Sequence, residues 1–119
     1  MTAHDFRLIA LSMPRDKEVV RYRHSDFRVG IDMFATVEDS GDIAVLMLTP
    51  EQQTAFIKKA PHVFGPVSGA SGRSGATNVR LGMADPRTVE MALSAAFSNV
   101  ASKPPVRPRQ RATWRPRST

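Results

Sequence analysis

The spacing of hydrophobic residues predicts a helix near the N-terminus of the chain. One helical face carries the apolar residues Phe6, Ile9, Ala10 and Met13. Thr2 and Asp5 have the spacing of the capping box that begins helices, and Pro14 cannot continue one. The first helix is therefore expected over residues 3–13.

From Glu18 to Leu48 the hydrophobic period is two, which is typical of strands with one buried face. Polar turns at Gly30–Asp32 and Glu38–Asp42 separate the runs, so the pattern predicts an antiparallel meander. Ile43–Leu48 is instead six apolar residues in a row. This run predicts a central strand covered on both faces. A second subunit could provide one of the covers, so a homodimer is left open.

The second half of the chain predicts two more helices and two more strands. Residues 49–52 combine an N-cap Thr, Pro at the first helical position and Gln at the third, so a helix is expected from there to Ala60. Extended segments are expected at 63–64 and 77–81. Asp85-Pro86 begins a third helix, whose buried face is expected to carry Val89, Leu93, Ala96, Phe97 and Val100. The expected order is α-β-β-β-(β)-α-β-β-α, an α+β arrangement.

The glycine-rich segment SGASGRSGATNVRL, residues 68–81, is a candidate phosphate-binding loop. A P-loop requires Lys followed by Ser or Thr after its last glycine, and neither pair follows Gly69, Gly72 or Gly75. A dinucleotide fingerprint opens a helix, whereas this segment is expected to open a strand. Both nucleotide readings are therefore rejected. The glycines are expected to permit positive φ angles and close backbone approach.

Composition narrows the class of protein further. The chain has 119 residues, a length typical of one domain, and no cysteine, which excludes disulfides, thiolate zinc sites and cysteine nucleophiles. It contains no apolar run of about 18 residues, so no membrane partner is expected. The apolar stretch at the N-terminus is too short for a signal peptide. A soluble, cytoplasmic protein is expected.

The positive charge of the chain is concentrated at its C-terminal end. The net charge is +6, and residues 103–119 hold six of the 17 basic residues and no acidic one. Residues 1–102 therefore hold 11 basic and 11 acidic residues, and we expect them to form the folded domain. Four prolines favour an extended, mobile tail over 103–119. Its Pro-x-x-Pro spacing at 105–108 is a weak polyproline-ligand pattern.

Several segments, in order and with matching spacing, resemble the MmcQ/YjbR family over nearly all of residues 3–102. They are YRHSDFRVGIDMFATV (22–37), AVLMLTPEQQTAFIKKAPHVFGPVSGASGRSGATNVRL (44–81) and DPRTVEMALSAAF (85–97). The resemblance implies a CyaY-like α+β fold, an antiparallel sheet with helices packed on one face. It also implies DNA binding through a double-wing arrangement of hairpins, and no catalytic activity. The chain departs from the family pattern at Ser71 (usually Trp), Ala76 (often aromatic) and Met47 (usually Lys).

Arginines provide the candidate DNA-binding residues. Strand alternation predicts a basic patch on the open sheet face, with Arg73 at its rim: Arg21, Arg23, Arg28 and Arg80. Planar guanidinium groups suit phosphate. The alternative is ordinary polar patterning in which Asp26 or Asp32 pairs with the arginines across strands. In the tail, basic residues flank an aromatic one that could stack on bases: Lys103, Arg107, Arg109, Arg111, Trp114, Arg115 and Arg117.

No catalytic or metal-binding constellation accompanies these residues. His24 lacks a partner nucleophile or paired carboxylates, and the three histidines have no metal-ligand spacing. The acidic turn 38–42 resembles the iron-binding surfaces of frataxin-like proteins, but three carboxylates also suit a solvated turn. No catalytic residue, cofactor or metal is therefore expected. The favoured function is non-enzymatic DNA binding; the alternative is a small-molecule- or protein-binding module that uses a cleft between sheet and helices.

Overall fold

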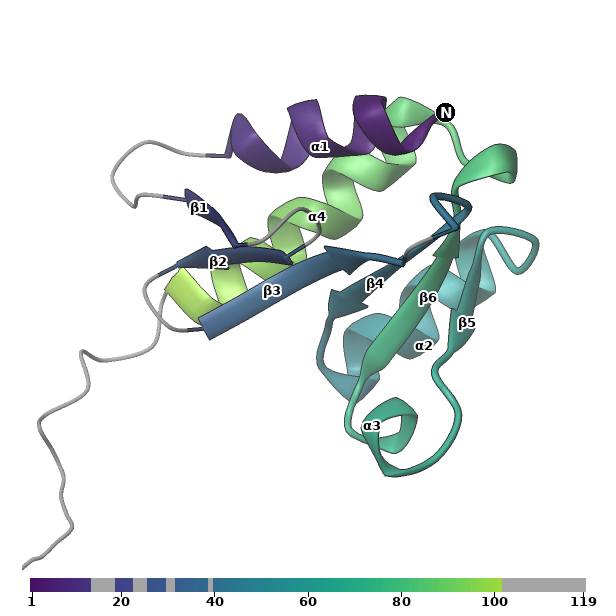
Figure 1. Cartoon of the computed structure of the whole chain (residues 1–119). Coiled ribbons are helices and arrows are strands. Elements are labelled where there is room, and N and C mark those ends of the chain that lie inside the picture. The colour runs from purple at the N-terminus through teal and green to yellow at the C-terminus, as the bar shows by residue number, and fades with distance from the viewer. Residues whose placement is uncertain (14–18, 23–25, 30–31, 39, 102–119) are drawn as a thin grey trace, which may run out of the picture.

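A six-stranded antiparallel sheet forms the centre of the molecule (Figure 1). The computed structural model describes residues 1–13, 19–22, 26–29, 32–38 and 40–101, with the backbone alone for 19–22. The strands are β1 (Val19–Tyr22), β2 (Asp26–Val29), β3 (Asp32–Val37), β4 (Ile43–Met47), β5 (Phe64–Pro66) and β6 (Ala76–Arg80). Their order across the sheet is β1-β2-β3-β4-β6-β5, so β4 lies in the interior and β1 and β5 at the edges.

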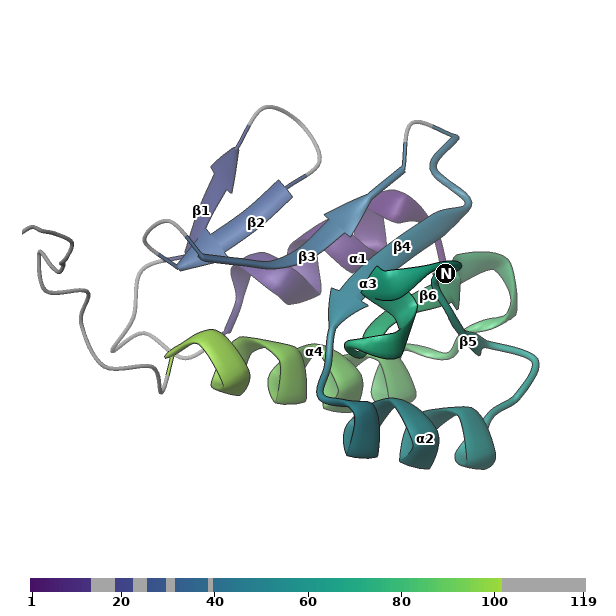
Figure 2. The same cartoon turned by 90° about the horizontal axis from the view of Figure 1, so that it is seen from below.

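The main helices cover one face of this sheet. They are α1 (Ala3–Leu11), α2 (Pro50–Lys59) and α4 (Pro86–Ala101); the shorter α3 (Ala70–Arg73) and the 3₁₀ turn η1 (Leu81–Met83) flank β6. Helix α4 packs across β2, β3 and β4, α1 packs on α4 and β1, and α2 packs on β5 and β6. Figure 2 shows α2 and α4 on the same side of the strands. The predicted α+β fold with helices on one face is confirmed.

The core lies between the sheet and this helical layer. Phe6 of α1 meets Phe27 of β2 edge-to-face, with ring centroids 6.2 Å apart, and Phe34 of β3 meets Phe97 of α4 in the same way at 5.6 Å. A bulge in the β2–β3 register lies beside Phe27. The extra residue of a bulge breaks the alternation of faces, which explains why the consecutive residues Phe34 and Ala35 are both fully buried.

Local sequence signals located the helices well. Thr2 and Asp5 form the predicted capping box, and so do Thr49 and Gln52 at the start of α2. All five residues predicted for the buried face of the last helix are buried. Helix α1 ends at Leu11, two residues before the predicted end. The structure adds two elements that were not predicted, α3 inside the glycine-rich segment and η1 after β6.

Strand β4 is interior, as predicted, but only one of its faces is fully buried. Ala44 and Leu46 point into the core, while Ile43, Val45 and Met47 are half-buried on the opposite face. The expectation that both faces are covered is therefore wrong for the described chain. The reason is that the three large helices all lie on the same side of the sheet. None of the described helices has the length and hydrophobicity required to cross a bilayer.

We expect the capping carboxylates Asp5 and Asp85 to titrate below the ordinary pKa of an aspartate. Hydrogen bonds from Thr2 lower the pKa of Asp5, and those from the Thr88 side chain and backbone N–H lower the pKa of Asp85, from an ordinary value of 3.8. A carboxyl whose pKa is lower in the folded state stabilises the fold above its unfolded pKa. This contribution is lost as the pH falls through the lowered folded value.

Carbon-detected NMR titration of the side-chain carboxyls measures these pKa values directly. Replacing Thr88 by valine removes the hydroxyl donor, so the pKa of Asp85 is expected to rise while that of Asp5 stays unchanged. Equal pKa values for Asp85 before and after the substitution would contradict the hydrogen bond from the Thr88 hydroxyl, because the backbone N–H of residue 88 still caps the helix in the variant.

Candidate binding face of the sheet

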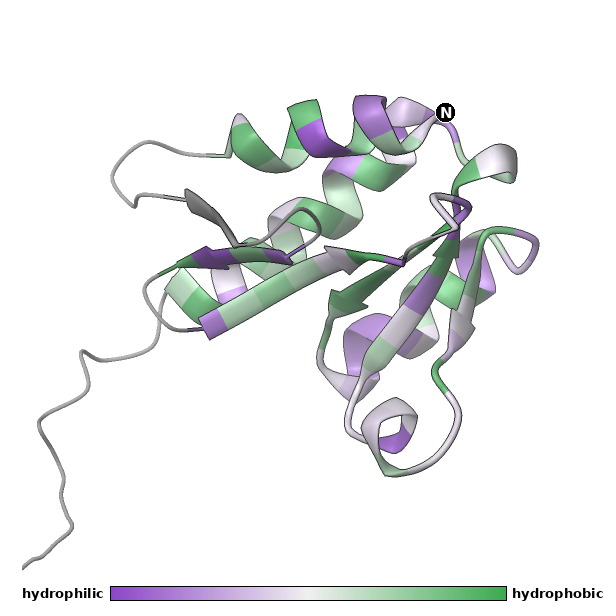
Figure 3. Cartoon of the chain, viewed as in Figure 1, coloured by the Kyte–Doolittle hydropathy of each residue, from purple (hydrophilic) through white to green (hydrophobic). Residues whose placement is uncertain are grey.

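The face of the sheet opposite α2 and α4, called the open face from here on, is the candidate binding surface. The register places Thr36, Val45 and Asn78 in one cross-strand row. A second row contains Ile43 and Arg80, and it continues to Glu38 because the Glu38 N–H donates to the Ile43 carbonyl at 2.9 Å. Strand β4 is hydrophobic along its length, whereas β6 alternates with hydrophilic positions (Figure 3). The open face therefore has an apolar centre with polar neighbours.

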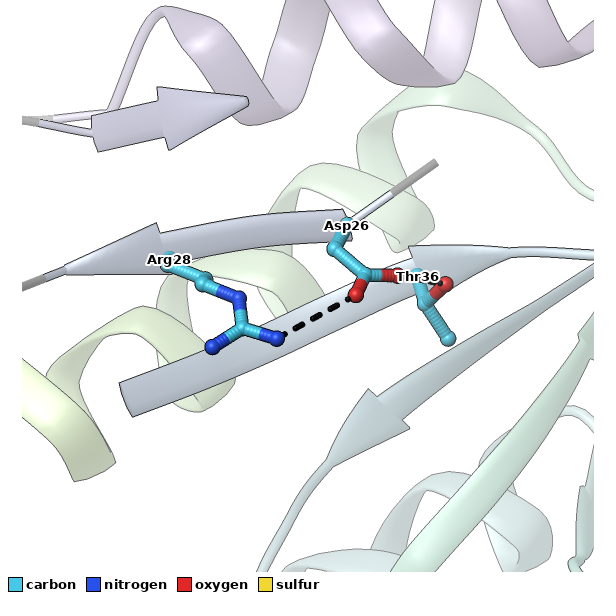
Figure 4. Close-up of polar contacts among 3 residues, drawn as sticks. All are labelled: Asp26, Arg28 and Thr36. Carbon is cyan, nitrogen blue, oxygen red and sulfur yellow. Dashed lines mark hydrogen bonds and ion pairs between the residues drawn. The ribbon is translucent and has the colours of Figure 1, made fainter. Parts of the chain in front are cut away.

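Arg28 lies on this face and is engaged by a carboxylate of its own strand. Its guanidinium Nη2 lies 3.4 Å from Asp26 Oδ2, and Thr36 Oγ1 donates to Asp26 Oδ1 at 2.7 Å (Figure 4). Both charged side chains are partly exposed, at 30% for Arg28 and 23% for Asp26. Arg28 therefore offers less net positive charge to a phosphate than an arginine without a carboxylate beside it.

Arg80 and Arg73 are the other described members of the predicted arginine patch. Both are exposed; Arg80 lies on the open face, where its Nη1 donates to the His62 carbonyl at 3.3 Å, and Arg73 ends α3. Strands β3 and β4 lie between Arg80 on β6 and Arg28 on β2, so the two backbones are at least about 14 Å apart across the sheet. They are also offset along the strands, because Arg28 pairs with Met33 whereas the row of Arg80 continues to Glu38. The described arginines are therefore spread over the face.

The remaining predicted residues are described incompletely or lie outside the described residues. The register puts the Cα of Arg21 opposite Phe27, and the Cα of Val20 opposite Arg28. Strand alternation alone predicted that Arg21 and Arg28 lie in the same patch. The backbone pairing does not group them. Arg23 and the tail residues lie outside the described residues: Lys103, Arg107, Arg109, Arg111, Trp114, Arg115 and Arg117.

Among the described residues, two hollows lie beside the centre of the open face. The first has a volume of about 350 Å³ and is lined by Glu38, Ile43, Val63, Gly65, Pro66, Asn78 and Arg80. The second, of about 380 Å³, lies between the end of β4 and α3 and is lined by Met47, Leu48, Ala70, Ser71, Ser74 and Ala76. Both hollows are lined in part by open-face residues. They are therefore in a different place from the predicted cleft, which was expected between the sheet and the helices. Alternation within single strands does not predict this grouping, because it depends on the register of three strands.

The glycine-rich segment is a tightly packed corner that holds the second hollow in place. A Cβ on Gly72 would lie 1.5 Å from the Val67 carbonyl oxygen, and one on Gly75 would lie 1.9 Å from that of Leu48. Gly69 and Gly75 have φ angles of 82° and 117°. The predicted close approach and positive φ angles are confirmed. This segment is thus built by backbone contacts that only glycine allows.

Gln53 of α2 connects this corner to the helical layer through two hydrogen bonds. Its side chain is 9% exposed, and its Nε2 donates to the carbonyls of Gly72 and Ala76, each at 2.9 Å. On the neighbouring turn, Asn99 of α4 donates to the carbonyl of Met47 at 3.1 Å and to Gln52 Oε1 at 2.8 Å. The end of β4 and the start of β6 are therefore held on the helical side by the buried amide of Gln53 and the partly buried amide of Asn99.

The described residues do not form a metal site. Nowhere in the part of the chain that the structure describes do three His, Asp or Glu side chains gather at a distance suited to a metal ion. Of the acidic turn, Glu38 borders the first hollow and Asp42 begins the approach to β4, while Asp39 lies outside the described residues. His24 also lies outside them.

Comparison with known proteins supports the fold. No family model matches the sequence, and no curated protein matches it significantly. Among solved structures, the chain is similar to the Deinococcus radiodurans protein DR2400, which has a DUF419 domain. The TM-score is 0.65 at 19% sequence identity, and the match covers 86% of this chain and 80% of that one. A likeness at this identity shows a shared fold, and DUF419 is itself of the MmcQ/YjbR-like kind.

Proposed function

We propose that the chain is a non-enzymatic, cytoplasmic protein of the MmcQ/YjbR family that binds DNA largely without sequence preference. The observation that carries the proposal is the distribution of charge. Residues 103–119 hold six basic residues and no acidic one, whereas residues 1–102 hold equal numbers of each. Contacts between cationic side chains and phosphates supply most of the affinity in such binding. Trp114 adds a ring that can stack on an unpaired base or enter the minor groove.

The folded part contributes a smaller share in this proposal. Arg73 and Arg80 are exposed, and neither has a carboxylate partner within ion-pair distance among the described residues. On the described open face, however, Glu38 and Asp26 match the charges of Arg80 and Arg28. A neutral face positions DNA weakly, so the tail, which follows the last described helix, is the principal anchor.

Fluorescence anisotropy of a short labelled duplex across a salt series tests the proposal. Six phosphate contacts predict a slope of about −5 when the logarithm of the association constant is plotted against that of the salt concentration. A full-length variant with the six basic tail residues replaced by glutamine is expected to lose most of its affinity. The same variant keeps every buried residue of the described core, because the last of these is Val100.

The matched control replaces the two exposed lysines near the end of α2, Lys58 and Lys59, by glutamine. This control removes two charges on the helical side, and the affinity lost per charge removed is expected to be smaller than for the six tail substitutions. If the tail variant binds DNA as tightly as the unaltered protein and with the same salt slope, the DNA contacts must lie in the folded part. No binding by either protein at low salt would refute the proposal.

A second candidate function, a ligand- or protein-binding module of the same fold, is favoured by the two hollows on the open face. In that case the tail would be incidental. Ile43, Val45 and Met47 are apolar, half-buried residues along the open side of β4. A second copy of the chain could cover them, so a homodimer remains a prediction. Sedimentation velocity of the full chain measures the oligomeric state directly.

A further inference from the structure

Opposite charges border the first hollow on the same cross-strand row. Glu38, the residue after β3, lies opposite Ile43 of β4, and Ile43 lies opposite Arg80 of β6, so the backbones of the two charged residues are about 10 Å apart. Ile43 separates them and forms the floor. The two side chains do not form an ion pair with each other in the described structure. The row therefore presents a carboxylate and a guanidinium on either side of an apolar floor.

The Arg80 side chain is held at the rim of the hollow. Its Nη1 donates to the His62 carbonyl at 3.3 Å, and its own backbone N–H is bonded to Val63 at 2.8 Å. One donor is thus used for positioning, and the remaining guanidinium donors suit a carboxylate, which accepts two parallel hydrogen bonds. Glu38 on the opposite side is an acceptor suited to an ammonium group.

The rest of the lining adds an amide and an apolar wall. Asn78 lies in the adjacent row and offers both a donor and an acceptor, while Val63 and Pro66 supply apolar surface on the β5 side. The volume of about 350 Å³ is at the small end of ligand sites in proteins. A ligand that fits this lining is small and carries a carboxylate, an ammonium group and an apolar side chain.

We propose that this hollow binds a free α-amino acid with an apolar side chain. The Arg80 guanidinium receives the carboxylate, Glu38 receives the ammonium group, and the side chain lies against Ile43, Val63 and Pro66. Asn78 binds whichever polar group faces it. The site is open to solvent, so the affinity is expected in about the millimolar range.

NMR titration of the full ¹⁵N-labelled chain with leucine tests this proposal. Saturable shifts are expected at the backbone amides of Ile43, Gly65 and Asn78. N-acetylleucine lacks the ammonium group and leucinamide lacks the carboxylate, so each is expected to bind about ten-fold more weakly than leucine, about 1.4 kcal/mol. These comparisons use the unaltered protein and do not depend on whether a variant folds.

Two substitutions assign the charges. Arg80→Gln is expected to weaken leucine binding and to leave leucinamide binding unchanged, because leucinamide has no carboxylate. Glu38→Gln is also expected to weaken leucine binding, but to leave N-acetylleucine binding unchanged, because N-acetylleucine has no ammonium group. Arg87→Gln, an exposed change on the first turn of α4, is the matched control and should alter neither. The proposal is overturned if leucine produces no saturable shift at these amides. It is equally overturned if N-acetylleucine binds as tightly as leucine.

Discussion

Replacing Gly75 by alanine is expected to lower the free energy of unfolding by more than about 3 kcal/mol, among the largest effects of any single change to an uncharged residue here. Gly75 has a φ angle of 117°, which L-amino acids with a side chain rarely adopt. A Cβ at this position would also lie 1.9 Å from the Leu48 carbonyl oxygen. The obstacle is backbone, so rotation of a side chain cannot relieve it. The turn into β6 must move away from the end of β4.

Urea unfolding followed by circular dichroism measures this loss. For a chain of this size, about 3 kcal/mol corresponds to a fall in Tm of roughly 10–15 °C. Gly82→Ala is the matched control, because an added Cβ there meets no atom within 4 Å and the φ angle is ordinary. The control is expected to stay within about 1 kcal/mol of the unaltered protein. Equal unfolding midpoints for Gly75→Ala and Gly82→Ala would mean that the corner is not packed as described.

Gly72 provides an independent check on the same corner. Its φ angle is not positive, so an alanine there faces a purely steric obstacle, the Val67 carbonyl oxygen at 1.5 Å. Conformational strain at Gly75 and steric overlap at Gly72 are different causes. Destabilisation by both substitutions would therefore locate the effect in the packing of residues 67–76 rather than in one unusual φ angle.

The helices could be predicted because their signals are local. A capping box is complete within four residues, as at Thr49–Gln52, and the apolar face of α4 repeats within one helix. Helix α3 has no such signal. It has Gly69 at its N-cap with no side-chain hydrogen bond, and it contains Gly72, a poor helix former. It is fixed by contacts with other segments. Gln53 of α2 donates to the Gly72 carbonyl, and the Val67 backbone packs against Gly72.

The binding face was harder to predict because alternation fixes faces only within one strand. Which residue of β1 lies opposite Arg28 depends on the pairing of β1 with β2, and that pairing selects Val20 rather than Arg21. The bulge beside Phe27 changes the alternation again between β2 and β3. The grouping of Glu38, Ile43 and Arg80 depends on two such registers, β3 with β4 and β4 with β6. A reader of the sequence could find it only by assuming both pairings.

Gln53 joins helix α2 to the glycine-rich corner and the start of β6, so its replacement is the second large effect we expect. Its amide is buried and is the donor to two carbonyls, those of Gly72 and Ala76. Gln53→Leu keeps a similar volume but leaves both acceptors without this donor. Each carbonyl keeps one backbone donor, the Gly75 N–H for Gly72 and the Val67 N–H for Ala76. The change therefore removes two hydrogen bonds of about 0.5–1.5 kcal/mol each, and a loss of about 1–3 kcal/mol is expected. Glu51→Leu, an exposed change two residues earlier on α2, is the control and should cost less than about 1 kcal/mol.

Gln53→Glu separates the hydrogen bonds from packing, because it changes one atom of the side chain and leaves its shape nearly intact. An ionised carboxylate would face two carbonyl oxygens with no donor between them, so burial raises the pKa of the introduced carboxyl in the folded state. A group whose pKa is raised by folding favours the fold most when it is protonated. The deficit relative to the unaltered protein should therefore be largest at neutral pH and shrink as the pH falls through the raised value. If Gln53→Glu shows no deficit at neutral pH, the side chain contributes volume alone, and its hydrogen bonds to the Gly72 and Ala76 carbonyls do not stabilise the fold measurably.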